Sequence, residues 1–206
     1  MKNNNSIIPR IWLLGGAIMA ITSTSARADL FDDSQRGGRT EIYGLGEYLT
    51  GWQTTTFSSF GVSSKFSSGV GGGIGLGINL NSHFNLNTEL AGAGLSLKGG
   101  NSAATISCDT TALQWRVGLD YNIFKTRLTP LVTASCGVLH FSGDFGDSRS
   151  RFSETDFSYG VGAGLRWDIS DHWFAKAVYR VNWTSLKDSD GPTMFQSIGI
   201  GVGYSF

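Results

Sequence analysis

Within the last twelve residues of the chain, FQSIGIGVGYSF, residues 197–206 alternate strictly between very small and large apolar side chains. Successive side chains of an extended strand point to opposite faces, so one face is apolar and the other carries only glycine and serine. The large set is Ile198, Ile200, Val202, Tyr204 and Phe206. A hydrocarbon solvent around the apolar face explains this pattern, as in a barrel whose strands cross a membrane. A strand of a secreted β-sandwich is the alternative.

Seven further segments show the same period of two, at residues 41–52, 70–80, 84–97, 113–122, 128–141, 157–169 and 173–183. With the last strand they make eight, and an even number keeps both ends of a barrel on one side of a membrane. The expected long connections are residues 53–69, 98–109, 142–154 and 184–194, and the short ones are 81–83, 123–127 and 170–171. Short periplasmic turns and long external loops are typical of such barrels. The sequence therefore predicts an all-β, eight-stranded, antiparallel transmembrane up-and-down β-barrel.

The phase of the first segment, residues 41–52, is ambiguous. One phase places Ile42, Tyr48 and Trp52 outside and Glu47 inside, whereas the other exposes Glu47 to lipid. A carboxylate in hydrocarbon is costly, so we expect the first phase. A bulge that switches the phase partway along the strand is the alternative.

Charged residues of these segments share the inward face. They are Glu47, Glu89, Asp120, Asp168, Arg116, Arg166, Lys176 and Arg180. Side chains just fill the interior of an eight-stranded barrel, and buried charges persist when they are paired. We expect Glu47 and Glu89 to engage Arg116 and Arg180 and to close the lumen. The alternative is a gated ion path.

The N-terminal residues 1–28 combine basic residues, an apolar run and the small residues Ala26 and Ala28. This is the composition of a secretory signal peptide. We expect cleavage after Ala28, a periplasmic lead-in at residues 29–40 and the barrel at residues 41–206. No apolar run is long enough for a membrane helix.

The 16 basic and 16 acidic residues balance and form no basic stripe, so we expect no nucleic-acid partner. Cys108 and Cys136 would lie in an oxidising compartment. Both alternatives stay open there: the two residues form a disulfide, or they remain unpaired thiols. Their spacing matches no metal motif, because no second pair of ligands accompanies them. We assign no catalytic, cofactor-binding or metal-binding residues.

Together these features resemble the small eight-stranded outer-membrane barrels of the OmpA and OmpX type. The resemblance rests on the alternating segments, the repeated Gly-x-Gly inner faces, LTPLVTASCG at residues 128–137 and the terminal Phe206. It implies the outer membrane of a Gram-negative bacterium, contact with lipid and lipopolysaccharide, and recognition of the last strand through Phe206 by the barrel-assembly machinery. Members of that family include structural anchors, adhesins, complement-resistance factors and a few enzymes.

One group of residues has the composition of a nucleophilic triad. His140 and Ser142 share the outward face at the end of the fifth segment, and Glu154 follows the next connection. A lipid A deacylase of the same barrel size has a His-x-Ser motif, but there the motif lies nearer the C-terminus and Asn follows the serine, whereas Gly143 follows here. We interpret His140 as an interface histidine beside a loop serine.

The first long connection, QTTTFSSFGVSSKFSSG, carries Phe57, Phe60 and Phe66 in a run rich in serine and threonine. Exposed aromatic residues in such a loop can contact a surface partner. Equally, the strands can continue beyond the membrane with the aromatic residues packed on each other. We expect a monomeric, non-enzymatic protein with a structural or adhesion-like role through its external loops. The alternatives are a narrow ion-conducting pore and a membrane-facing lipid A esterase.

Overall fold

The computed structural model describes residues 35–50, 55–57, 62–101, 104–144, 151–185 and 192–206. The expected signal peptide lies outside the described residues. Strands form the regular structure of the described ranges: β1 Thr40–Thr50, β2 Thr55–Phe57, β3 Val62–Phe66, β4 Gly69–Asn79, β5 Phe84–Asn101, β6 Ala104–Asn122, β7 Leu128–Asp144, β8 Arg151–Asp168, β9 Trp173–Thr184 and β10 Thr193–Ser205. Among these residues no helix has the length and apolarity that a membrane span requires.

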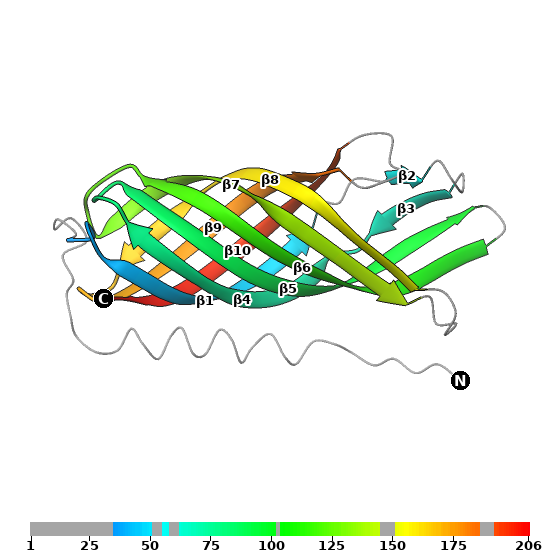
Figure 1. The fold of residues 1–206 in the computed structure, drawn as a ribbon, viewed down its shortest axis with the longest axis horizontal. Helices are drawn as coiled ribbons and strands as arrows, with labels where there is room; N and C mark the ends of the chain where they lie inside the picture. The colour runs from blue at the N-terminus through cyan, green and yellow to red at the C-terminus, as the bar shows by residue number, and fades with distance from the viewer. Residues whose placement is uncertain (1–34, 51–54, 58–61, 102–103, 145–150, 186–191) are drawn as a thin grey trace.

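Eight of the described strands close into a barrel (Figure 1). Their order is β5-β4-β1-β10-β9-β8-β7-β6, and the pairing of β5 with β6 completes the ring. All of these pairings are antiparallel. The predicted eight-stranded antiparallel barrel is therefore confirmed. We call the end that carries the short connections 80–83, 123–127 and 169–172 the turn end, and the opposite end the loop end.

The phase expected for the first strand is also confirmed. Ile42 and Tyr48 are 47% and 43% exposed, whereas Glu47 is buried inside the barrel. β1 pairs with β10 residue for residue from Glu41 to Thr50, so no bulge switches the phase. Trp52 lies outside the described residues.

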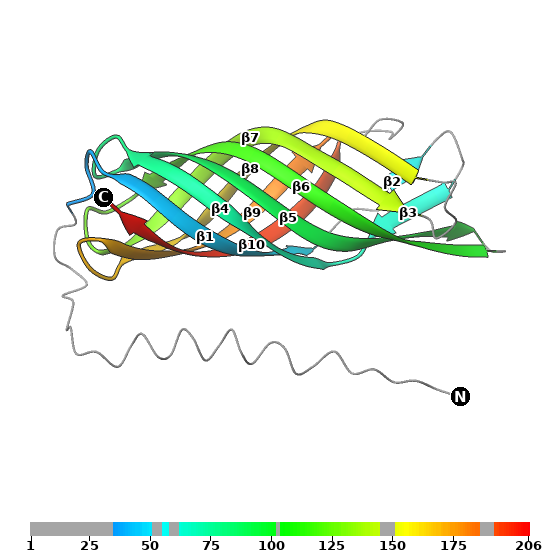
Figure 2. The same ribbon diagram turned by 60° about the horizontal axis from the view of Figure 1, so that its bottom comes forward.

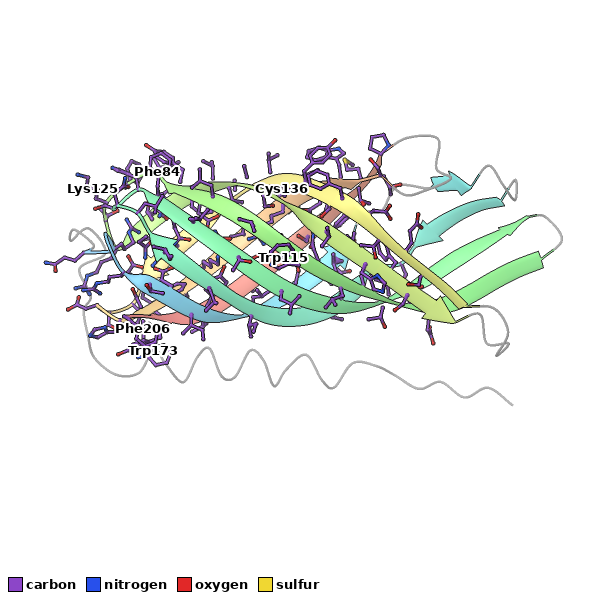
Figure 3. All side chains as sticks on the ribbon, viewed as in Figure 1. Phe84, Trp115, Lys125, Cys136, Trp173 and Phe206 are labelled. Carbon is purple, nitrogen blue, oxygen red and sulfur yellow. The ribbon has the colours of Figure 1, made fainter. Side chains whose placement is uncertain are left out.

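Large apolar side chains cover the outside of the barrel (Figure 3). At the turn end the Tyr204 ring packs against Trp173 and Phe206, with ring centroids 5.4 and 5.0 Å apart. At the loop end Tyr159 and Trp183 stack at 5.6 Å. Aromatic girdles at two levels of the barrel are typical of membrane interfaces, where amphipathic rings meet both hydrocarbon and water.

Each of two short turns contains a histidine, and its ring binds the end of a neighbouring strand. In each case Nδ1 donates a hydrogen bond to a backbone carbonyl, and the ring stacks on a girdle tyrosine. His83 donates to the Asn122 carbonyl at 2.7 Å and stacks on the Tyr121 ring. His172 donates to the Ser205 carbonyl at 3.0 Å and stacks on the Tyr204 ring. These contacts attach each turn to one neighbouring strand, β6 for His83 and β10 for His172.

The loop end differs from the expectation for residues 98–109, which were predicted to form a long loop. β5 and β6 continue as one hairpin until Asn101 lies opposite Ala104. β3 pairs with the outer part of β5, and β2 pairs with β3. The strands of this external sheet project beyond the barrel at the loop end (Figure 2). Alternation among small polar residues is too weak a signal to distinguish such an extension from a loop.

Candidate functional site

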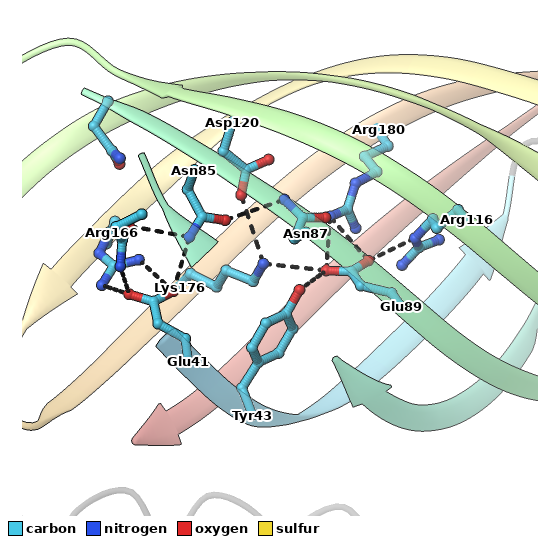
Figure 4. A network of polar contacts seen from close by, with 12 residues as sticks. Glu41, Tyr43, Asn85, Asn87, Glu89, Arg116, Asp120, Arg166, Lys176 and Arg180 are labelled. Atoms are coloured by element: carbon cyan, nitrogen blue, oxygen red, sulfur yellow. Dashed lines mark hydrogen bonds and ion pairs between the residues drawn. The ribbon is translucent and has the colours of Figure 1, made fainter. Parts of the chain in front are cut away.

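The interior of the barrel brings together all of the charged residues that strand parity placed there. Each member of the set is 6% exposed or less: Glu47, Glu89, Asp120, Asp168, Arg116, Arg166, Lys176 and Arg180. They are arranged in two layers, one at mid-depth and one nearer the turn end (Figure 4).

Glu89 contacts four other residues of the middle layer. Its carboxylate accepts hydrogen bonds from the Tyr43 hydroxyl at 2.7 Å and from Arg116 Nε at 2.6 Å. Lys176 Nζ lies 3.1 Å and Arg180 Nη2 3.2 Å from its oxygens. Three cations around one buried carboxylate leave excess positive charge, so further carboxylates are needed nearby.

Glu47 and Asp120 supply those carboxylates. Arg116 Nη1 lies 3.0 Å from Glu47 Oε1, and Lys176 Nζ lies 3.6 Å from Asp120 Oδ2. The middle layer therefore contains three carboxylates and three cations. The predicted engagement of Glu47 and Glu89 with Arg116 and Arg180 is confirmed.

Sequence reasoning missed Tyr43 as part of this network. Its ring lies under Lys176, with Nζ 3.9 Å from the ring centroid, and its hydroxyl donates to Glu89. A Cβ at Gly75 would overlap the Tyr43 ring, so glycine on β4 makes room for the tyrosine on β1. The parity that placed Glu47 inside also places Tyr43 inside, and that was the available signal.

The second layer lies nearer the turn end. Arg166 Nη2 lies 2.6 Å from Glu41 Oε1, and Arg166 Nε lies 2.8 Å from Asp168 Oδ1. Asn79 and Asn85 donate further hydrogen bonds to the Glu41 carboxylate at 2.5 and 3.2 Å. Glu41 was not among the predicted interior charges, although it lies on the same face of β1 as Glu47.

Arg36 closes the turn end of the lumen. Its guanidinium is buried, lies 3.3 Å from Asp168 Oδ2 and donates to the Phe124 carbonyl at 2.8 Å. Burial lowers the pKa of this guanidinium, and the nearby Asp168 carboxylate opposes that effect. Gly38, with φ of 79°, allows the chain to turn between Arg36 and β1. Residues 29–40 were expected to form a periplasmic lead-in, and Arg36 within it is part of the ion network.

Toward the loop end the lumen contains an apolar cluster together with buried neutral polar side chains such as Gln114, Ser158 and Asn182. The buried cluster there consists of Leu49, Ala93, Leu95, Ala112, Leu139, Phe141 and Phe195. At the turn end a cavity of about 20 Å³ beside Arg36 and Arg166 has room for about one water molecule. Across the described residues the interior is thus filled by paired charges, by neutral polar side chains and by an apolar cluster.

The triad candidate is not assembled. His140 Nδ1 is 2.7 Å from the Thr155 hydroxyl on the outer surface. Glu154 lies opposite Phe141 in the β7–β8 register, and Phe141 points into the barrel. The carboxylate and the histidine therefore belong to opposite faces of the sheet, and Glu154 cannot orient the His140 ring.

The two cysteines are far apart. Cys136 is a free, exposed thiol on the lipid side of β7, and it lies opposite Val117 on β6. Cys108 is nine positions further along β6, roughly 30 Å away at the usual strand rise. A disulfide requires Cα atoms within about 7 Å, which excludes a bridge within the chain.

Of the first long connection, Phe57 lies in β2 and Phe66 in β3, whereas Phe60 lies outside the described residues. The backbone thus follows the second of the two expectations for this segment, in which strands continue beyond the barrel. β2 and β3 extend the sheet sideways from β5.

Comparisons with known proteins agree with this fold. The sequence model of the family described as outer membrane protein beta-barrel domain matches residues 17–206. The outer membrane protein OprG from Pseudomonas aeruginosa superposes with a TM-score of 0.60 at 13% identity, covering 84% of this chain and 98% of that chain. Neisserial surface protein A (NspA) superposes with a TM-score of 0.59 at 18% identity, covering 82% of this chain and 99% of that chain. At these identities the likeness concerns the fold. No curated protein gives a significant match.

Proposed function

This chain belongs to the outer membrane protein beta-barrel domain family, and from that premise we propose that it acts in surface interaction through the sheet at its loop end. It is an outer-membrane protein of a Gram-negative bacterium. Barrels of this class place their short turns in the periplasm and their long connections outside the cell. The external sheet of β2, β3, β5 and β6 then faces the medium.

The observation that carries the proposal is an open backbone edge on this sheet. β7 stops pairing with β6 where Asp144 lies opposite Asp109. Among the described residues, positions 104–108 of β6 have β5 on one side and no strand on the other. A row of unpaired N–H and C=O groups can bind an extended segment of another protein by adding a strand.

The composition of the edge permits strand addition. Residues 104–108 read ATISC, without a charged residue or a proline to block strand addition. Strand addition of this kind takes its affinity from backbone hydrogen bonds and its specificity from alternate side chains. The partner chemistry that we propose is an extended polypeptide segment at the cell surface.

Shortening the hairpin tests this function. Lys98 lies directly opposite Ser107, so an Asn-Gly turn can replace residues 99–106 without changing the barrel register. We expect cells displaying the shortened protein to lose binding to immobilised extracellular polypeptides that the unchanged protein binds. A variant with residues 186–191 replaced by a Gly-Ser linker of equal length is the control. Binding that survives hairpin shortening would contradict the proposal.

The alternative of a narrow pore is testable on the same protein. Because charges and apolar side chains fill the lumen, we expect no steady single-channel conductance from the unchanged protein in planar bilayers. Large, stable current steps would favour the pore instead. An Arg36→Ala variant tests whether the turn-end closure contributes, since it removes a buried guanidinium that spans from Asp168 to Phe124.

We also propose that residues 1–28 are a cleaved signal peptide and that the assembly machinery recognises the last strand through Phe206. Support for the second point is the regular pairing of the terminus: the Phe206 amide donates to the Thr40 carbonyl at 2.8 Å. The Phe206 side chain is 68% exposed on the lipid side, where a partner can contact it.

A further inference from the structure

A groove lies on the outer surface of the barrel at the turn between β6 and β7. Its apolar walls are Ile123, Phe124, Leu128, Pro130 and Leu165, and its volume is about 620 Å³. Small-molecule sites have volumes of about 300 to 1,000 Å³, and this groove, which is open on its outer side, falls within that range. We call it the turn groove.

The shape of the turn groove is fixed by hydrogen bonds. The Ile123 amide donates to the Pro130 carbonyl at 2.9 Å, and the Phe124 amide donates to the Thr129 hydroxyl at 2.8 Å. On the inner side the buried Arg36 binds the Phe124 carbonyl at 2.8 Å. The Phe124 side chain is therefore held outside, where it is 54% exposed.

A cation marks one end of the groove. Lys125 is exposed, lines the groove and forms no ion pair within the part of the chain that the structure describes. The neighbouring cation Arg127 is already paired, with Nη2 3.2 Å from Asp171 Oδ1. Lys125 is thus available for an anion from outside the protein.

The position of the groove determines what can occupy it. Lys125 lies at the same end of the barrel as Phe84, Trp173 and Phe206 (Figure 3), at the level of the turn-end aromatic girdle. That level is the headgroup region of the periplasmic leaflet, and the apolar walls extend from it toward the hydrocarbon. A lysine at such a level reaches the polar interface with its ammonium while its stem stays in apolar surroundings.

From this arrangement we propose that the turn groove binds one anionic phospholipid of the periplasmic leaflet, with its phosphate on Lys125 and an acyl chain along Phe124, Leu128 and Leu165. The unpaired ammonium favours a headgroup with a net negative charge over a zwitterionic one, in which a second cation offsets the phosphate. The site does not depend on the surface-interaction role, because it lies at the opposite end of the barrel.

The test uses the full protein in phosphatidylcholine vesicles that contain spin-labelled phosphatidylglycerol or spin-labelled phosphatidylcholine with the same acyl chains. We expect the protein to immobilise phosphatidylglycerol about fivefold more strongly, which is the size typical of one lysine near an anionic surface. Lys125→Glu and Lys125→Gln should both abolish this preference. Leu165→Trp keeps the charge but fills the groove, and it should reduce the preference as well.

The control is Lys65→Glu, which makes the same charge change on β3 at the loop end and should leave the preference intact. Folding of each variant is verified by the shift in gel mobility of the unheated barrel. The proposal is overturned if the unchanged protein shows no preference for phosphatidylglycerol. It is equally overturned if Lys125→Gln and Lys65→Glu behave alike.

Discussion

Arg116→Ala is expected to lower the free energy of unfolding by about 3 to 5 kcal/mol, the range for a buried ion pair that loses one partner. Arg116 is 2% exposed and binds Glu47 and Glu89 at 3.0 and 2.6 Å. Glu89 keeps Tyr43, Lys176 and Arg180 when Arg116 is removed. Within the described residues Glu47 has no second cation, so its carboxylate would be left buried and unpaired.

A double variant separates this effect from a loss of packing. Adding Glu47→Gln to Arg116→Ala removes the stranded charge, and we expect it to recover a substantial part of the lost stability. Arg127→Ala is the surface comparison, because the Arg127–Asp171 pair lies at the surface with the Asp171 side chain 73% exposed, and surface pairs contribute about 0 to 1 kcal/mol. Urea titrations of the protein folded in lipid vesicles measure all three. Equal losses for Arg116→Ala and Arg127→Ala would show that the interior network does not stabilise the fold.

Period two was sufficient to predict the barrel, because a strand that faces lipid cannot mix charged and apolar residues on its outer face. The inward placement of both Glu89 and Arg116 follows from the same rule, and the register of β5 and β6 then sets them opposite each other. The interior pairs were therefore predictable as a set. Parity alone does not give the depth of a side chain in the barrel or the residue that it pairs with. The separation into two layers therefore became visible only from the registers of the strand pairs.

The elements that sequence reasoning missed lie where the membrane no longer constrains composition. Outside the hydrocarbon, β5 and β6 continue with small polar residues, and alternation no longer distinguishes a strand from a loop. Arg36 precedes the first strand and reaches the lumen only because the chain turns at Gly38. The turn groove depends on three short hydrogen bonds around the β6–β7 turn, which no spacing pattern encodes.

The outer and inner faces of the barrel lie in different surroundings. The outside contacts hydrocarbon, so an isolated charge there has no partner. The inside is polar, and the charged side chains described there have partners. A charge introduced on the outer face should therefore cost most at mid-depth, where water is furthest away. Two tryptophans of nearly equal exposure allow that depth effect to be isolated.

Trp115→Arg is expected to destabilise the protein by about 2 to 4 kcal/mol, the cost of an arginine on the lipid face near the bilayer midplane. Trp115 is 51% exposed on β6 and lies midway along the barrel (Figure 3). Its Nε1 donates to the Thr88 hydroxyl at 2.9 Å, and losing that hydrogen bond adds a smaller cost. Trp115→Phe measures the smaller cost separately.

The matched control is Trp173→Arg, at a tryptophan that is 52% exposed but lies in the turn-end girdle (Figure 3). There the same substitution should cost only about 0 to 1 kcal/mol, because the guanidinium reaches the interface. Both variants are compared in folding titrations into lipid vesicles. Equal effects would place Trp115 and Trp173 at the same depth and contradict the transmembrane orientation of β6, whereas a large difference ties the outward face of that strand to the hydrocarbon core.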